Sequence, residues 1–397
     1  MTFKSLKVNE NVYWVGALDW DERDFHNFEI VRGTSYNAYL IIDDKITLVD
    51  TVKYEFFHEM MERIKELIDP SKIDYIISNH VEIDHSGSLP KIKEVAKNAT
   101  IICTSKGKEG LCRYFDCKNW DFKVVKTGDE LKIGRKTLMF VEMPMLHWPD
   151  SMVTYIKEDK LLLSSDAFGQ HIASIERYDE ELGVEEAIKW AKIYYANILM
   201  PFSELIKRKL SEIEKLGIQI EMIAPAHGVI WKNPGKIVSA YKDWAEFKSE
   251  NKLVVVYDTM WNSTKALAKA IVDGAKHGNI KVRLFHVRKD PWSEIVTEIL
   301  DAKAVAIGAP TMHNTVFPPV AGFLAYMKSL KPKNKIGVAF SSYGWGGGAV
   351  REINKVFEEL KFEIMEPLQV KYKPTEDELK KAFELGVEVA EKISKTY

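Results

Sequence analysis

The chain has 397 residues, of which 46% are apolar, and its 56 basic and 58 acidic residues leave a formal charge of -2. This length allows two or three domains with large buried cores. No basic face large enough to suggest binding of nucleic acid stands out. The longest purely apolar runs, such as Leu253–Tyr257, are far too short for a membrane-spanning helix. The polar segment Met1–Asn9 lacks the apolar stretch of a signal peptide, so we expect a cytoplasmic protein.

The three cysteines are Cys103, Cys112 and Cys117. An odd and sparse count argues against a disulfide framework and fits a reducing compartment. The Cys112–Cys117 spacing is not Cys-x-x-Cys, and three thiols cannot form the two such pairs of a rubredoxin-type iron centre. If the protein handles electrons, they must therefore arrive from another molecule.

The first half of the chain combines short strands with amphipathic helices. Because strands pair first with each other and later with helices, we expect packed sheets flanked by helices. The helices are predicted at Phe56–Leu67, Val184–Ile198 and Glu204–Leu216. The strands are predicted at Val12–Val15, Asn37–Ile42, Ile46–Val49, Ile73–Ser78, Ala99–Cys103, Leu138–Val141, Val153–Ile156, Leu161–Ser164 and Glu221–Pro225.

The second half alternates strictly between strands and helices from Asn251 onwards. This pattern is typical of a doubly wound parallel sheet. The polar segment Lys248–Lys252 has no apolar periodicity, so we place the boundary there and predict domains at 1–250 and 251–397. The last helix is predicted at Glu376–Ser394, and the strands at Leu253–Tyr257, Val282–Val287, Ala304–Gly308, Ile336–Ala339 and Phe362–Met365.

Possible metal ligands gather directly after predicted strands. The strand that ends at Ser78 leads into a segment with four of them within six residues, although such a segment alone could merely cap the following helix. Three further candidates follow other strands, and each of these alone would be an ordinary polar residue. Together they supply four imidazoles and three carboxylates, enough for two metals that share a carboxylate: His80, Glu82, Asp84, His85, His147, Asp166 and His227.

The order and spacing of these residues resemble the metallo-β-lactamase superfamily, whose usual motif is His-x-His-x-Asp-His. The chain departs from this motif at Glu82, which replaces the second histidine. A hard carboxylate shifts the preference from zinc towards iron. With this substitution, Leu146–Asp150 and Asp166–His171 closely resemble the flavodiiron proteins.

The resemblance implies a non-haem diiron site in a metallo-β-lactamase-like αββα sandwich. It implies that one iron is held by His80, Glu82 and His147, the other by Asp84, His85 and His227, with Asp166 as the bridge. His171 lies outside this ligand set, and we interpret it as a catalytic residue that orients a ligand or a proton. The alternative for His171 is a satisfied structural histidine.

Three loops of the second half are predicted to bind FMN. The first opens a helix, where hydroxyl groups and free N–H groups form a phosphate cradle, although an ordinary capped helix would look the same. The others follow the strands at which flavodoxins hold the isoalloxazine ring, and all three resemble the flavin loops of flavodiiron proteins. The predicted residues are Thr259, Met260, Trp261, Asn262, Ser263 and Thr264, then Pro310, Thr311, Met312, His313 and Asn314, and finally Ser341, Tyr343, Gly344, Trp345, Gly346, Gly347 and Gly348.

The resemblance therefore implies an oxidoreductase that reduces dioxygen to water, nitric oxide to nitrous oxide, or both. Electrons from a separate donor, either rubredoxin or the reduced deazaflavin coenzyme F-420, would pass through FMN to two irons. Family members form head-to-tail homodimers, which can pair again into dimers of dimers. The alternative is a dizinc hydrolase of the metallo-β-lactamase type with a regulatory flavodoxin domain, against which Glu82 counts. A pure FMN electron carrier would leave the seven ligand-type residues unexplained.

Overall fold

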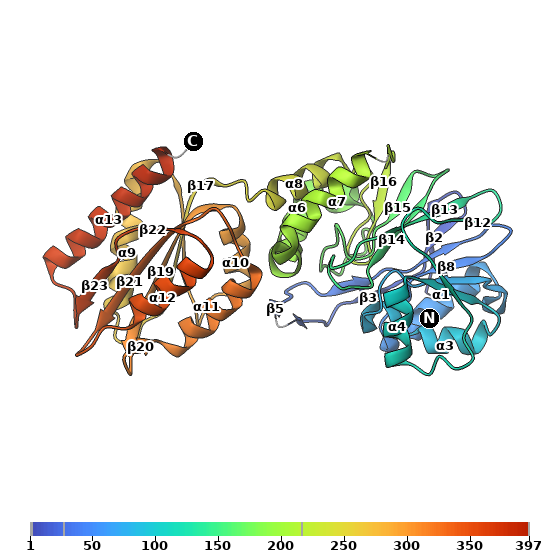
Figure 1. Ribbon diagram of the computed structural model, residues 1–397, viewed down its shortest axis with the longest axis horizontal. Helices are drawn as coiled ribbons and strands as arrows, with labels where there is room; N and C mark the ends of the chain where they lie inside the picture. The colour runs from blue at the N-terminus through green and yellow to red at the C-terminus, as the bar shows by residue number, and fades with distance from the viewer. Residues whose placement is uncertain (1–2, 27, 216, 396–397) are drawn as a thin grey trace. The chain divides into compact units, whose positions relative to one another are not determined.

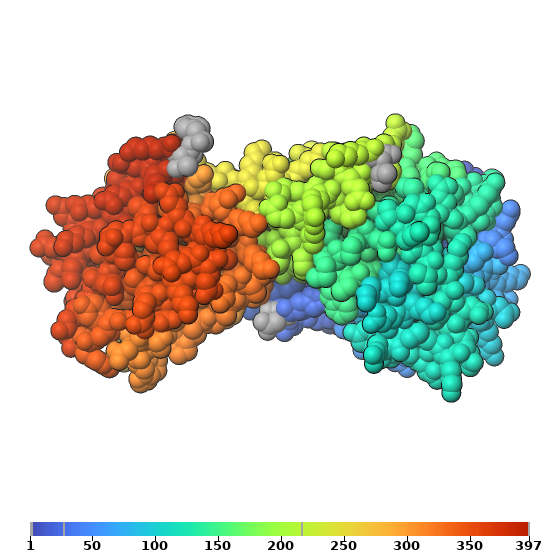
Figure 2. Space-filling view, viewed as in Figure 1, coloured from blue at the N-terminus to red at the C-terminus, as the bar shows by residue number. Residues whose placement is uncertain are grey.

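The computed structural model describes residues 3–26, 28–215 and 217–395 and separates into two compact units (Figure 1). The first consists of Met1–Tyr195 with Glu204–Lys242, and the second of Ala196–Ser203 with Asp243–Tyr397. Figure 2 shows one face of each unit, coloured along the chain. The boundary predicted after residue 250 lies at the first residue of strand β17.

Two sheets form the centre of the first unit. The larger sheet has the strand order β1-β2-β7-β8-β9-β10-β11, and the smaller one has the order β12-β13-β14-β15-β16. The strands of the larger sheet are β1 Leu6–Asn9, β2 Val12–Trp14, β7 Tyr39–Ile41, β8 Thr47–Val49, β9 Tyr75–Ile77, β10 Thr100–Cys103 and β11 Phe122–Val124. Those of the smaller sheet are β12 Glu130–Lys132, β13 Thr137–Glu142, β14 Met152–Ile156, β15 Leu161–Leu163 and β16 Met222–Ala224.

Alternation along the strands of the larger sheet produces two separate cores. Ile77 and Ile102 face the smaller sheet and pack with Phe140. Their neighbours Ile76 and Ile101 belong to the other core, which the helices α1 Phe57–Leu67, α3 Leu89–Val95 and α4 Ser105–Tyr114 cover (Figure 1). Because successive side chains of a strand point to opposite faces, a strand between a sheet and helices is apolar throughout. The predicted arrangement of packed sheets with flanking helices is confirmed.

The helices after β15 differ from the prediction at their ends. The helix expected at Val184–Ile198 is divided into α6 Val184–Tyr194 and a π-helix at Tyr195–Leu199, and a 3-10 turn at Met200–Phe202 leads into α7 Ser203–Lys215. The predicted end of α7 at Leu216 lies outside the described residues. The elements that the sequence analysis did not predict include α2 Ile83–Ser86, α5 Asp179–Leu182, α8 Gly235–Ala245 and the small strands β3 Ala17–Asp19, β4 Asp24–Phe25, β5 Phe28–Glu29 and β6 Thr34–Tyr36.

The cysteines correct one expectation. Cys112 and Cys117 form a disulfide, with their Cα atoms 5.3 Å apart, whereas Cys103 is free and buried. The low cysteine count argued against a disulfide framework, but a count contains no information about the distance between two thiols. The helix α4 ends at Tyr114, so Cys112 lies in its last turn and Cys117 lies three residues after its end.

The second unit is a parallel sheet with the strand order β18-β17-β19-β21-β22. This is the flavodoxin-like order, and it confirms the predicted doubly wound sheet. The last predicted strand, Phe362–Met365, is observed as the shorter β22. The strand β23, which was not predicted, also pairs with β21. The strands are β17 Glu250–Tyr257, β18 Lys281–His286, β19 Ala302–Met312, β21 Ile336–Tyr343, β22 Glu363–Ile364 and β23 Leu368–Lys371, with β20 Thr315–Val316 antiparallel to the end of β19.

Helices cover both faces of this sheet. The helices α9 Ser263–Ala275 and α13 Glu376–Lys395 share a core with β17, β19 and β21 (Figure 1). The remaining helices are α10 Trp292–Leu300, α11 Pro318–Leu330 and α12 Ala349–Glu359. Among the described residues, no helix is both long and apolar enough to cross a membrane.

Candidate functional site

The seven predicted metal ligands lie on four segments of the first unit, each directly after a strand. The segment after β9 carries four of them, His80 and Glu82 in the loop and Asp84 and His85 on α2, and the others follow β13, β15 and β16. All are buried except Glu82, which is half-buried. The structure arranges them in two groups whose ligand atoms lie within 4.8 Å of one another: His80, Glu82, His147 and Asp166, and Asp84, His85 and His227.

In the first group, both imidazoles face the same carboxylate oxygen of Glu82. Glu82 Oε2 lies 3.2 Å from His80 Nε2 and 3.4 Å from His147 Nε2. In the second group, Asp84 Oδ1 lies 3.4 Å from His85 Nε2, and Asp84 Oδ2 lies 3.2 Å from His227 Nε2. All four imidazoles therefore turn Nε2 towards the centre of the site.

Asp166 lies between the two groups and offers one oxygen to each. Its Oδ2 atom is 3.3 Å from His147 Nε2 and 3.6 Å from His80 Nε2. Its Oδ1 atom is 3.1 Å from His85 Nε2 and 3.3 Å from His227 Nε2. A carboxylate in this position suits a ligand shared by two cations.

The unsatisfied polar atoms of the site fit bound metal. Both oxygens of Asp84 and of Asp166 lack a hydrogen-bond partner of suitable geometry within the described parts of the chain, although imidazole nitrogens lie 3.1–3.6 Å away. Buried carboxylates are rarely left without hydrogen-bond partners, and several of them close together require cations to compensate their charge. The ligand types, imidazole and carboxylate without thiolate, fit iron.

The electrostatics of the site lead to the same conclusion. Burial alone would lower the pKa of His147 and of His227, but their contacts with Asp166 and other carboxylates raise these pKa values to about 9 and about 10. Burial opposes ionisation of Asp166, yet the surrounding histidines hold its pKa well below the usual range. Protons on the imidazoles thus compensate the carboxylates, and metal binding would release those protons.

Further residues orient the ligands from behind, and the sequence did not reveal these roles. Asp150 Oδ2 accepts hydrogen bonds from His80 Nδ1 at 2.9 Å and from the Val81 N–H at 2.8 Å. His227 Nδ1 donates to the Ser35 carbonyl oxygen at 2.6 Å. In both cases Nδ1 is occupied, and Nε2 is left for the metal.

His26 is a further residue that the sequence analysis missed. It lies between β4 and β5, and its Nε2 atom is 2.5 Å from Glu82 Oε1. The other oxygen, Oε2, faces His80 and His147. No motif surrounds His26, and only the fold of the β4–β5 hairpin brings it to the site.

His171 lies beside the second group without joining it. Its Nδ1 atom is 2.8 Å from Thr34 Oγ1, and its ring centroid is 4.8 Å from that of His227. Burial, reinforced by the charges of His227 and His26, holds its pKa well below the usual range, so the ring is neutral. Its Nε2 atom is buried and lacks a hydrogen-bond partner among the described residues.

The predicted flavin loops meet at the carboxyl ends of β17, β19 and β21. Thr264 Oγ1 is 2.8 Å from Ser342 Oγ, and this contact connects the first loop to strand β21. Thr311 Oγ1 accepts hydrogen bonds from the N–H groups of Gly348 at 3.2 Å and Ala349 at 3.3 Å, which connects the second loop to the third. The carboxyl ends of neighbouring parallel strands form the ligand-binding edge of such sheets.

The backbone of these loops is tightly constrained. Asn262, His313 and Asn314 adopt positive φ angles of 67°, 50° and 61°. A side chain at Gly348 would bring its Cβ atom within 2.0 Å of the Asn314 carbonyl oxygen, so only glycine fits there. Trp261 and Trp345 are 88% and 83% exposed and offer large aromatic faces for stacking.

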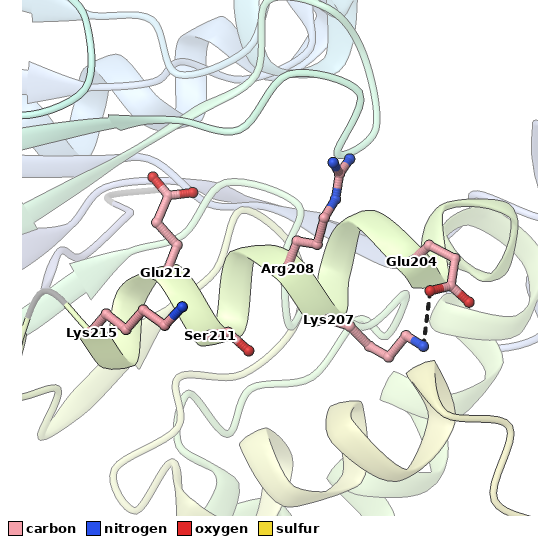
Figure 3. A pocket seen from close by; sticks show the side chains of 6 residues that line it. All are labelled: Glu204, Lys207, Arg208, Ser211, Glu212 and Lys215. Atoms are coloured by element: carbon pink, nitrogen blue, oxygen red, sulfur yellow. Dashed lines mark ion pairs between the residues drawn. The ribbon is translucent and has the colours of Figure 1, made fainter.

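A hollow on the surface of α7 contains no comparable chemistry. Figure 3 shows that its side chains all come from this one helix, and an ion pair of 2.9 Å joins Glu204 to Lys207. Charges of opposite sign at helical spacing are typical of a solvated helix face. The lining residues are Glu204, Lys207, Arg208, Ser211, Glu212 and Lys215.

Comparison with known proteins covers both units. Residues 34–228 match the family model described as ODP family beta lactamase, and residues 255–386 match the flavodoxin model. The chain is 45% identical to a nitric oxide reductase of Moorella thermoacetica, and the alignment covers 98% of this chain and 99% of that protein.

Solved structures also resemble the whole chain. The rubredoxin oxygen:oxidoreductase of Desulfovibrio gigas has a TM-score of 0.96 at 37% identity, with 98% of this chain and 99% of that chain covered. The flavodiiron protein of Giardia intestinalis has a TM-score of 0.95 at 34% identity, with 98% and 97% covered.

Proposed function

Because the chain belongs to the flavodiiron protein family, we propose that it reduces dioxygen to water, nitric oxide to nitrous oxide, or both, with electrons from an external donor. It is an oxidoreductase that carries FMN in its flavodoxin domain and a non-haem diiron site in its lactamase-like domain. When bound, FMN supplies electrons, and the two irons supply the open coordination positions at which the gas is reduced.

In this proposal, His80, Glu82 and His147 would hold one iron, and Asp84, His85 and His227 would hold the other. Asp166 would be shared by both. The observation that carries the assignment is that the two oxygens of Asp166 face different groups, each within 3.6 Å of two imidazole nitrogens.

Other side chains of the chain prepare this site for the reaction. Asp150 holds His80 in the tautomer that presents Nε2 to the metal, and the Ser35 carbonyl does the same for His227. His26 engages Glu82 Oε1, which leaves Oε2 as the metal-binding atom. His171 is neutral and offers its unpartnered Nε2 atom as an acceptor or donor of a proton.

Three loops are proposed to hold FMN, with the residues predicted from the sequence. Thr259 Oγ1 is buried and has no hydrogen-bond partner among the described residues. This is expected for a hydroxyl group that donates a hydrogen bond to an oxygen of a bound ligand. The exposed tryptophans Trp261 and Trp345 fit stacking on the flavin or on its electron donor.

We propose two candidate donors, rubredoxin and the reduced deazaflavin coenzyme F-420. The name of the Desulfovibrio gigas structure supports the first, since it describes an enzyme that uses rubredoxin. We also propose that the active form is a head-to-tail homodimer, in which each flavin serves the diiron site of the partner chain.

The decisive experiment is anaerobic turnover of the iron- and FMN-loaded protein with each reduced donor, followed by dioxygen or nitric oxide. We expect donor oxidation that depends on both cofactors. Full oxidase activity with stoichiometric zinc in place of iron would overturn the diiron assignment, and metal-dependent hydrolysis without any reductase activity would support the zinc hydrolase instead.

A further inference from the structure

A buried carboxylate lies directly before the first flavin loop. Asp258 follows β17 and is fully buried. Its N–H group donates to the Gly308 carbonyl oxygen of β19 at 3.0 Å, so its position is tied to the centre of the sheet. The metal site lies on a different unit, and neither that site nor the three predicted loops include Asp258.

Arg288 neutralises this carboxylate from the loop after the neighbouring strand β18. Its Nε atom lies 3.0 and 2.8 Å from the two oxygens of Asp258, and its Nη2 atom lies 2.7 Å from Oδ1. The guanidinium is also 5.3 Å from the centroid of the Phe317 ring. Bidentate geometry makes this a strong pair although half of the Arg288 side chain is exposed.

The same two side chains hold the residue that opens the flavin loop. The Thr259 N–H donates to Asp258 Oδ1 at 2.6 Å, and Arg288 Nη2 donates to the Thr259 carbonyl oxygen at 2.8 Å. The backbone of Thr259 is therefore fixed on both sides. Its hydroxyl group, in contrast, is buried and has no hydrogen-bond partner among the described residues.

The charges explain why Asp258 requires this partner. A phosphate group carries negative charge, and a buried carboxylate close to it would repel it strongly at low dielectric. With Arg288 in place the pair is neutral, and the N–H groups at the start of α9 can attract the phosphate.

We propose that Asp258 and Arg288 form a positioning clamp for the FMN phosphate. The clamp orients Thr259 so that its hydroxyl faces the phosphate, and it cancels the charge of the carboxylate beneath the loop. This inference rests on the proposed assignment of residues 259–264 to FMN.

The test uses the full-length protein from which FMN has been removed, titrated with FMN and, separately, with riboflavin, which lacks the phosphate. Quenching of flavin fluorescence measures both affinities. We expect Arg288→Ala to weaken FMN binding by about tenfold or more, since a charged hydrogen-bonded group is lost, and to leave riboflavin binding nearly unchanged. Arg283→Ala is the matched control, because Arg283 on β18 is an exposed arginine that pairs with Glu298, at 3.7 Å, and not with Asp258.

A double variant isolates the role of charge. In Asp258→Asn combined with Arg288→Ala, the amide oxygen can still accept the Thr259 N–H, but no negative charge remains. We expect this variant to bind FMN more tightly than Arg288→Ala alone. Arg288→Lys, which keeps the charge but loses the bidentate contact, should lie between the wild type and Arg288→Ala.

The results separate the clamp from the loop assignment. Thr264→Ala with Asn262→Ala tests the loop itself, and equal affinities of that variant and the wild type for FMN would overturn the loop assignment. If that variant loses FMN but Arg288→Ala does not, the clamp is wrong and the loop assignment stands. Equal losses of FMN and riboflavin in Arg288→Ala would also overturn the clamp, because the effect would not act through the phosphate.

Discussion

The metal loops and the flavin loops hold their residues in opposite ways. The metal loops bury their side chains, each imidazole turns one nitrogen inward, and carboxylates or carbonyls hold some of these rings from behind. The flavin loops leave Trp261 and Trp345 exposed and depend on positive φ angles and glycines. A metal is bound by specific side-chain atoms, whereas a flavin is bound largely by backbone shape. Substitutions should therefore act sharply in the first region and gradually in the second.

The largest effect is expected from Asp166→Ala, which should remove both irons and leave FMN in place. Asp166 offers one oxygen to each ligand group, so no other residue can compensate for its loss. Measurement of iron and FMN per chain checks this. The control is His171→Ala, which should retain iron and change only turnover or gas affinity, and iron loss in that variant would show that His171 is itself a ligand.

A mixture of two inactive chains should recover activity if electrons cross between protomers. One chain carries Asp166→Ala and lacks iron, and the other carries Thr264→Ala with Asn262→Ala and binds FMN weakly. A mixed head-to-tail dimer would pair one intact flavin with one intact diiron site, so donor-dependent turnover should partly return. If mixed dimers form with their cofactors and remain inactive, transfer occurs within a chain.

Asp150→Asn should weaken iron binding by about tenfold to about a hundredfold, as is typical when the partner of a metal-binding histidine is changed. The amide can still occupy the space but no longer supports His80 with a negative charge. Iron retention during chelator titration measures the effect. Asp159→Asn is the matched control, since Asp159 pairs with Lys136 instead of a ligand. Equal iron loss in both variants would refute the role of Asp150.

The smallest effect is expected from Trp345→Ala, which should weaken FMN binding by about fivefold through lost stacking. Because Trp345 is 83% exposed, its removal should leave the melting temperature of the flavin-free protein unchanged. Flavin fluorescence titration measures the affinity, and Trp20→Ala, at an exposed tryptophan of the other unit, serves as the control. A complete loss of FMN would mean that Trp345 is as indispensable as a metal ligand. That result would contradict the expected difference between the metal loops and the flavin loops.

The sequence predicted which ligand-type residues lie together better than it predicted the details of the fold. Each of the seven residues follows an apolar strand, and this pattern is local. Asp166 and His227 look like ordinary polar residues when taken singly, and they were selected only because such residues recur at several strand ends. The strand expected from Asn37 begins only at Tyr39, and the Asn37 side chain donates to the carbonyl oxygens of Pro225 and Gly228 beside His227. The disulfide between Cys112 and Cys117 was missed because residue counts contain no distances.

What could be read from the chain were properties of neighbouring residues: apolar alternation, ligand types at strand ends, and glycine-rich loops after parallel strands. The partners of those residues could not be read in this way. His227 meets the carbonyl of Ser35 across 192 residues of chain, Glu82 meets His26 across 56, and Asp258 meets Arg288 across 30. Such contacts depend on how separate strands and loops come together, and no local pattern specifies them, because the free energy that selects them comes from packing of the whole domain.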